Sequence, residues 1–172
     1  LVCLVGSEMC IRDRYNSYTK QQEEINLNYE DVRIYLCGPT VQSSPHLGHG
    51  RSAVVFDFFI RYLKFLNYSV LFVRNITDID DKIIQKSQEK NINYRVLAES
   101  VWKEFVQAHD NLNCLVPDIE PRATAYVPEI VEYIDQLIKN GHGYITISGV
   151  YYDVSNFDDY LKLYGRSTEC LL

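Results

Sequence analysis

The stretch VRIYLCGPTVQSSPHLGHGR, residues 32–51, decides the fold class. Its first six residues alternate, are rich in β-forming side chains and stop at a Gly-Pro pair, which predicts a strand over Val32–Cys37. After a polar loop, apolar residues recur at helical spacing over about Leu47–Leu66. Ser69–Arg74 is a second compact apolar strand. Because a strand–helix–strand crossover joins parallel strands, this half of the chain is predicted to be α/β.

The second half is predicted to be mainly helical. The helical spacing of the first predicted helix rests on Val54, Val55, Phe58, Tyr62, Phe65 and Leu66. Three further helices are expected. The first is opened by a capping box at Thr77–Asp80, the second is capped by Asn93 and has Val101, Phe105, Ala108 and Leu112 as its buried stripe, and the third runs from near Pro128 to Gly141. A proline-containing connection over Pro117–Pro121 precedes the third helix, and a hairpin around Ser148-Gly149 follows it. Two parallel strands alone cannot form a stable doubly wound sheet, so the chain is expected to be a fragment.

Composition excludes several classes of protein. The 172 residues are 47% hydrophobic and include 14 Tyr and 7 Phe, which is typical of a globular chain and excludes intrinsic disorder. A net charge of −6 argues against a protein that coats nucleic acid. No apolar run approaches the roughly 18 residues that span a bilayer, so no membrane partner is expected.

The cysteines indicate a reducing compartment. Their number is odd and their spacing irregular, which favours free thiols over a secreted disulfide framework and predicts a cytoplasmic location. They are Cys3, Cys10, Cys37, Cys114 and Cys170. The first fourteen residues, LVCLVGSEMCIRDR, show neither sustained periodicity nor the features of a signal peptide. We expect residues 1–14 to be a non-native or disordered extension.

The loop after the first strand carries the candidate chemistry. In an open α/β sheet, ligands bind at the carboxyl ends of strands, and a helix N-terminus attracts phosphate. His46 and His49 lie three residues apart at the predicted helix start, so they share a face and can stabilise charge on a reacting phosphate. Gly48 and Gly50 permit close approach of a ligand. By itself, however, the pair fits ordinary surface or core histidines better.

A resemblance favours the chemical interpretation. His46–His49, placed after a strand and a Pro-containing loop, resembles the HIGH signature of class I aminoacyl-tRNA synthetases. A wider set of blocks is similar, in the same order, to cysteinyl-tRNA synthetases: Tyr15–Thr19, Tyr35–Thr40, His46–Arg51, Val73–Ile84, Pro121–Thr124 and Val150–Asp153. That family usually carries Tyr-Asp where this chain has Gln42-Ser43. The resemblance covers essentially everything after residue 14.

The resemblance implies a fold and a division of the chain. The fold is a Rossmann-like (HUP-type) nucleotide-binding half-domain with a mainly helical connective insertion, truncated. Residues 15–85 would be the first half of the catalytic domain, and residues 86–172 an incomplete helical and hairpin insertion. The implied activity is ATP-dependent activation of cysteine to cysteinyl-adenylate and its transfer to tRNA(Cys), by an enzyme that is a monomer at full length. The fragment itself is expected to be inactive.

The resemblance also implies roles for individual residues. His46 and His49 match the catalytic histidines that contact ATP, together with Thr40 and Gly48, and Mg²⁺ would accompany ATP. Gly38 and Thr77 match positions near the amino-acid substrate, although Thr77 could equally be a helix cap. The nearby Asp78, Asp80 and Asp81 fit the dipole of a helix start better than a metal cluster.

A zinc ion would allow the enzyme to distinguish its substrate cysteine from serine. A plain pocket distinguishes such similar side chains by only about 1–3 kcal/mol, whereas a soft thiolate binds Zn²⁺ far better than a hydroxyl does. From spacing alone, Cys37 fits a buried structural thiol. The resemblance makes it the first of four zinc ligands, with the other three absent from this chain.

Two other functions stay open. A cysteine ligase of mycothiol synthesis would share the fold, the zinc and the adenylation step. In that family the loop reads Thr-Pro-Tyr-Asp and the Asp-Lys-Ile-Ile continuation is missing, so Thr40–Gln42 and Asp81–Ile84 favour the tRNA enzyme. The chain could also be a truncated paralogue that binds nucleotide without catalysis.

Overall fold

The computed structural model describes residues 13–24 and 31–163. The chain divides into two compact units, which are treated separately below. One unit lies within Tyr29–Glu129, and the other contains the described residues at both ends of the chain, 13–24 and 130–163.

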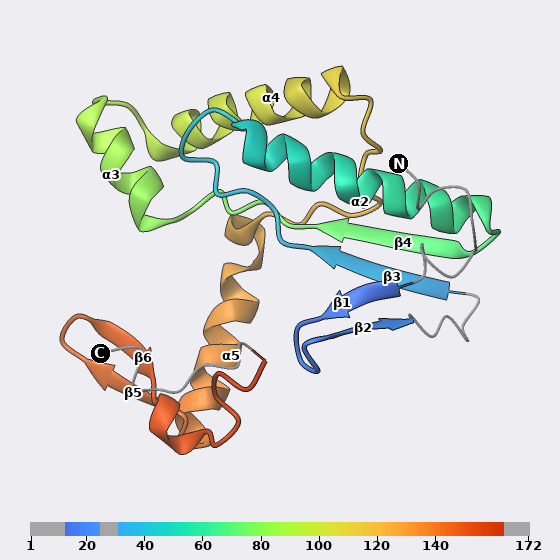
Figure 1. Ribbon diagram of the computed structural model, residues 1–172. Coiled ribbons are helices and arrows are strands. Elements are labelled where there is room, and N and C mark those ends of the chain that lie inside the picture. The colour runs from blue at the N-terminus through green and yellow to red at the C-terminus, as the bar shows by residue number, and fades with distance from the viewer. Residues whose placement is uncertain (1–12, 25–30, 164–172) are drawn as a thin grey trace. The chain divides into compact units, whose positions relative to one another are not determined.

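The first unit is built on a parallel βαβ crossover. Strand β3 (Asp31–Leu36) is followed by helix α2 (Leu47–Phe65) and strand β4 (Ser69–Arg74). The two strands pair in parallel over their whole length. Figure 1 shows α2 running along β4, with α4 (Tyr94–Asn111) beside α2. The predicted strand–helix–strand order is therefore confirmed, and Asn67 takes the left-handed conformation expected just after the helix, with φ of 65°.

The connection after α4 extends this sheet, which the sequence did not indicate. Residues 118–123 run parallel to β4 and the residues after it, with bridges from Val73 to Ile119 and from Ile76 to Arg122. The amide of Arg74 donates to the Ile119 carbonyl at 3.1 Å, and the amide of Ile76 donates to the Pro121 carbonyl at 2.8 Å. A proline is tolerated here because the segment lies at a sheet edge and Pro121 supplies only its carbonyl.

Helices α3 (Asp81–Glu89) and α4 complete the unit. Asn93 caps α4 through the amide of Arg95, as predicted. The predicted capping box at Thr77 is wrong, because α3 begins at Asp81 and its N-cap is Asp80, which accepts from the Lys82 amide at 2.9 Å. Thr77 instead forms a parallel bridge with Thr40, so its backbone is already committed to the sheet edge.

The core of this unit lies between α3, α4 and the loops after the two strands. Its buried residues are Val41, Ile76, Ile83, Leu97, Ala98, Val101, Trp102 and Phe105. The predicted stripe of α4 is confirmed for Val101 and Phe105, whereas Leu112, at the helix end, is exposed. In α2 the buried residues are Ala53, Ile60 and Leu63, while most of the apolar residues that predict the helix are exposed. That helix is apolar on more than one face, so periodicity could not select the buried one.

The described residues of the second unit form two hairpins and a helix. Strands β1 (Asp13–Asn16) and β2 (Gln21–Glu24) are antiparallel, as are β5 (Gly143–Thr146) and β6 (Gly149–Tyr152). Helix α5 (Val127–Lys139) follows a short 3₁₀ turn, η2 (Ala123–Tyr126), and all but its first three residues belong to this unit. A second 3₁₀ turn, η3 (Val154–Asn156), follows β6. Gly141, with φ of 78°, ends the helical region as predicted.

Strand β1 includes the end of the segment 1–14 that was expected to be a non-native or disordered extension. It begins at Asp13, so the last two residues of that segment are paired with β2, and residues 1–12 lie outside the described residues. The division at residues 85 and 86 stays a prediction. Within 13–24 and 31–163, no helix combines the length and the apolar character needed to cross a bilayer.

Candidate functional site

A pocket of about 290 Å³ opens where β3 and β4 end, at the edge predicted to bind a ligand. Its wall combines the loop after β3, the first turns of α2, the last residue of β4 and one face of α4. The lining residues are Leu36, Cys37, Gly38, Pro39, Thr40, Gln42, Ser43, His46, His49, Ser52, Ala53, Arg74, Phe105 and His109.

Most of the predicted site residues meet in this pocket. Cys37, Gly38, Thr40, His46 and His49 all line it. Gly48 lies between the two histidines but is not part of the pocket wall. Thr77 is also outside the wall, and its backbone is hydrogen-bonded to the loop after β3. The roles predicted for these residues are not tested by their positions.

The two histidines cap the helix with one nitrogen each and leave the other nitrogen free. The amide of Gly48 donates to His46 Nδ1 at 3.1 Å, and the amide of His46 donates to His49 Nδ1 at 3.2 Å. A nitrogen that accepts a hydrogen bond carries no proton, so in each neutral ring the proton resides on Nε2. The rings stack with centroids 3.8 Å apart. The start of α2 therefore presents two stacked imidazoles, each with one N–H donor not used by the cap.

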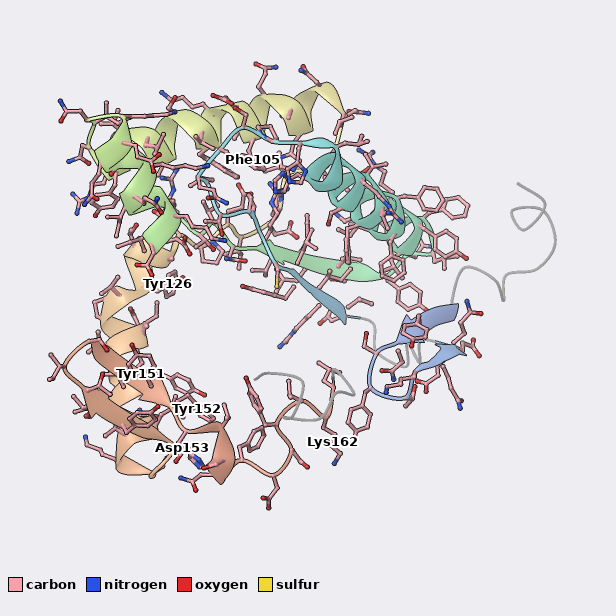
Figure 2. The ribbon with its side chains drawn as sticks, turned by 60° about the vertical axis from the view of Figure 1, so that its left-hand side comes forward. Phe105, Tyr126, Tyr151, Tyr152, Asp153 and Lys162 are labelled. Atoms are coloured by element: carbon pink, nitrogen blue, oxygen red, sulfur yellow. The ribbon has the colours of Figure 1, made fainter. Side chains whose placement is uncertain are left out.

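Packing holds His49 in this state. Its ring meets the buried Phe105 ring edge-on at 4.9 Å, and Figure 2 shows Phe105 on α4 beside the start of α2. Burial lowers the pKa of His49, and the neighbouring His46 lowers it further. A neutral His49 is what the cap requires, because protonation at Nδ1 would remove the acceptor of the His46 amide.

The loop that carries Cys37 and Gly38 is fastened to the residues after β4. The Gly38 amide donates to Asn75 Oδ1 at 2.8 Å, and Asn75 Nδ2 donates to Thr77 Oγ1 at 3.2 Å. The Thr77 backbone completes the join, since its amide donates to the Pro39 carbonyl and its carbonyl accepts from the Val41 amide. The Thr77 hydroxyl thus serves the loop and not a helix.

A buried arginine forms part of the pocket wall. Arg74 donates from Nε and Nη2 to Glu120 Oε1, at 3.1 and 2.6 Å, and its Nη1 lies 3.2 Å from His109 Nε2. The guanidinium also lies over the Trp102 ring, 5.9 Å from its centroid. The side chain is only 8% exposed. Sequence reasoning missed this group, although a charged residue closing an apolar strand was a signal that could have been followed.

His109 is held neutral beside this arginine. Burial, followed by the charge of Arg74, lowers the pKa of His109 to about 4, while the Phe105 backbone and Asp110 act in the opposite direction. Its Nδ1 is buried and makes no well-formed hydrogen bond within the described part of the chain. Nothing in the sequence pattern marked His109, which lies on α4 far from the histidines of α2.

The described residues do not form a complete metal centre. Across 13–24 and 31–163, no group of three or more His, Cys, Asp and Glu side chains is arranged to hold an ion. Cys37 supplies one exposed thiol on the pocket wall, so its position fits a ligand that reaches into the pocket but does not make a site by itself.

Comparison with known proteins decides the family. The family of tRNA synthetases class I (C), catalytic domain, matches residues 23–171. This chain belongs to that family. A crystal structure of the arginyl-tRNA synthetase of Plasmodium falciparum resembles the class I synthetase chain with a TM-score of 0.53 and 20% identity, over 78% of this chain and 31% of that one. That likeness concerns the fold alone.

Several curated relatives of this synthetase chain share a name. A protein named cysteine–tRNA ligase from Maridesulfovibrio salexigens is 48% identical over 159 residues, which are 91% of this chain and 33% of the relative. Proteins of the same name from Methanococcus maripaludis and Persephonella marina are 44% and 42% identical, over 92% of this chain and 33% of each relative. The chain thus spans about a third of the length of these relatives.

Proposed function

We propose that the protein to which this chain belongs is a cysteine–tRNA ligase. It activates cysteine with ATP to cysteinyl-adenylate and transfers the cysteinyl group to tRNA(Cys). The observation that carries the proposal is the pocket at the end of β3, where Cys37, His46 and His49 line one wall in a synthetase chain. The names of the relatives supply the amino acid.

In the first step the cysteine carboxylate would attack the α-phosphorus of ATP, which forms the bond of the adenylate and displaces pyrophosphate. Little covalent chemistry falls to the protein in such a transfer, so positioning and charge stabilisation account for most of the catalysis. The free Nε2–H groups of His46 and His49 would donate to phosphate oxygens on which charge develops. Thr40 and the helix start at Gly48 would complete the ATP site, and Mg²⁺ would be held mainly by the phosphates.

The amino acid would lie against Cys37 and Gly38. When bound, zinc would supply a soft Lewis acid that takes a thiolate in preference to a hydroxyl. Cys37 would be one of its ligands, because its exposed thiol faces this pocket, and three further ligands are required from outside the described residues. Thr77 would act on the substrate indirectly, through the Gly38 loop that it supports.

The fold type, the cellular location and the oligomeric state of the full-length enzyme belong to the same proposal. The crossover β3–α2–β4 would be the start of a Rossmann-like (HUP-type) half-domain, covering residues 15–85, with residues 86–172 as a connective insertion. The enzyme of full length would be a cytoplasmic monomer.

Cysteine-dependent exchange of pyrophosphate into ATP tests the proposal. A protein of the relatives' full length that contains this chain should show the exchange and charge tRNA(Cys), whereas the 172-residue chain alone should show neither. Exchange with cysteine but no tRNA charging, together with ligation to an amino sugar, would identify the mycothiol-pathway ligase instead. Nucleotide binding without any exchange would identify a paralogue that lacks catalysis.

Zinc content tests the role of Cys37 separately. In the full-length protein, Cys37→Ser should abolish stoichiometric zinc binding, measured by atomic absorption, while Cys114→Ser should not change it. Cys114 is the matched control because it is also a free cysteine but lies outside the pocket wall. Full zinc retention in Cys37→Ser would remove this residue from the ligand set.

A further inference from the structure

We propose that His109 is a positioning residue of the pocket: it fixes the Arg74 guanidinium so that Arg74 can hold the carboxyl group of the amino-acid substrate. The inference rests on the proposed function and adds two residues to its site. Both side chains line the pocket, and the proposed function gives a role to neither, although Arg74 lies within the block Val73–Ile84.

The contact between the two side chains fixes the state of His109. A guanidinium carries only donors, so the 3.2 Å contact between Arg74 Nη1 and His109 Nε2 requires that Nε2 accepts. His109 is therefore neutral, with its proton on Nδ1. A histidine in this form acts toward Arg74 as a fixed acceptor with no charge of its own.

Most of the surroundings of His109 favour this form, and only Asp110 and the Phe105 backbone favour the protonated ring. Arg74 faces it from β4, and His49 faces it from α2. On its own helix, Asp110 is the neighbouring charge, and the Phe105 ring lies 6.2 Å away between centroids. Glu120 acts from the strand-like segment 118–123 through its pair with Arg74. A second cation at His109 would face the arginine directly, which the buried setting opposes.

Arg74 is fixed on three sides and retains donors. Glu120 takes Nε–H and one Nη2–H, His109 takes one Nη1–H, and Trp102 lies against the guanidinium. Of the five N–H groups of an arginine, one on each terminal nitrogen remains. Since Glu120 balances the charge, the group offers two directed donors and not a free cation. Such donors suit an oxygen pair on a small carboxyl group.

The position of Arg74 selects the amino acid over the nucleotide. Its Cγ lies 3.3 Å from the point where a Cβ on Gly38 would be, so the side chain packs beside the residue that follows Cys37. The donors suited to phosphate, His46 and His49, stand on a different element, the start of α2. A carboxyl group held near Gly38 would meet the α-phosphate between these two sets of donors.

Three variants in the full-length protein test the inference. His109→Phe keeps a ring against Phe105 but removes the acceptor, and His109→Gln restores an acceptor without the ring. His142→Phe is the control, because His142 also has a buried Nδ1 without a partner but does not line the pocket. The Michaelis constants for cysteine and for ATP are measured in the exchange reaction, and thermal unfolding checks that each variant folds.

Loss of the acceptor should raise the KM for cysteine about tenfold in His109→Phe, as expected when one hydrogen bond to a charged group is lost. The KM for ATP should change less than about twofold, and His109→Gln should recover most of the cysteine affinity. Equal effects on both substrates, no difference between the two His109 variants, or unchanged constants throughout would overturn the inference.

A spectroscopic measurement separates this inference from the proposed function. Nitrogen-15 shifts of labelled histidines, assigned by comparison with His109→Gln, should show an unprotonated Nε2 and a protonated Nδ1 in His109. A proton on Nε2 would refute the inference even in an active enzyme. If the wild-type protein lacks cysteine-dependent exchange, the proposed function fails, and the claim that Arg74 holds a substrate carboxyl group fails with it; the tautomer measurement still decides the structural part.

Discussion

Gly38 and Asn75 approach so closely that a Cβ on Gly38 would lie 1.5 Å from the Asn75 carbonyl oxygen. The Gly38 amide also donates to the Asn75 side chain at 2.8 Å. The ends of β3 and β4 are thus joined by one backbone contact that only glycine permits and by one side chain, and the pocket wall starts at this join.

We expect Gly38→Ala to separate the two strand ends and to destabilise the chain by about 3 kcal/mol or more, because the new methyl group meets backbone and not a flexible side chain. Urea unfolding followed by the fluorescence of Trp102, the single tryptophan, measures the change. Gly50→Ala is the control, since a Cβ there meets only a side-chain atom at 3.4 Å in a helix. A similar loss in both variants would mean that the close contact is not what Gly38 provides.

His46 combines two roles that a substitution can separate. His46→Asn should keep the cap on the Gly48 amide and hence the stability, whereas His46→Ala should lose about 1 kcal/mol, because the helix start loses its acceptor. Both should reduce cysteine-dependent exchange in the full-length protein by about 10²–10³-fold, since both lack the Nε2–H donor. Normal exchange in His46→Asn would confine this residue to capping.

His49 should be as important for the rate as His46. We expect His49→Ala to lower the exchange rate by about 10²–10³-fold, with little change in the KM for cysteine, because its donor acts on developing phosphate charge. Steady-state kinetics of the full-length protein provide the test. A main effect on the KM for cysteine would assign His49 to the amino acid instead.

The low pKa of His109 makes stability depend on pH. In the unfolded chain a histidine titrates near 6.5, whereas burial and Arg74 lower the pKa in the folded state to about 4. Between these values the unfolded state binds more protons. The stability that comes from keeping His109 neutral is therefore fully present above about pH 6.5 and is lost as the pH falls toward 4, and it is on the order of 2–3 kcal/mol once the partial exposure of the ring to solvent is allowed for. Urea unfolding at pH 7 and pH 5 should therefore differ less in His109→Gln than in the wild type.

Asp78 and Thr124 join the residues after β4 to the 3₁₀ turn η2. The buried Asp78 accepts from the Thr124 amide at 2.9 Å and from its hydroxyl at 2.6 Å. Thr124→Val should cost about 1.5–3 kcal/mol, because a hydrogen bond to a buried carboxylate is lost, whereas Thr124→Ser should cost less than about 1 kcal/mol. Unfolding free energies of the two variants provide the comparison, and equal losses would mean that the hydroxyl hydrogen bond contributes no more than the methyl group.

Local patterns predicted the elements better than the contacts between them. Alternation and helical spacing located β3, α2 and β4 to within a residue or two, because each signal lies within its own segment. The same spacing could not identify the buried face of α2, whose apolar residues surround the helix. The strand-like segment 118–123 was missed because Pro117 just before it and Pro121 within it indicate a loop, while its pairing depends on β4, far away in the sequence.

The candidate site was predicted only where a motif existed. His46, His49 and Cys37 belong to one short segment, and the fold brings them to one pocket. Arg74, His109 and Glu120 come from three separate segments, and no spacing rule relates them. The resemblance placed Thr77 near the amino-acid substrate, and its position before acidic residues also fitted a helix cap. Neither pattern indicated the backbone hydrogen bonds that Thr77 forms with Pro39 and Val41.

The salt bridge between Arg74 and Glu120 also sets an order of events on the ribosome. The two residues are 46 positions apart, so at about 5–20 residues per second the arginine is synthesised roughly 2–9 s before its partner. Throughout that interval a nascent β3–α2–β4 crossover would have to bury an unpaired cation. The pocket wall is therefore completed late in translation of this segment, and a nascent chain arrested before Glu120 should keep Arg74 in water and remain open to proteases.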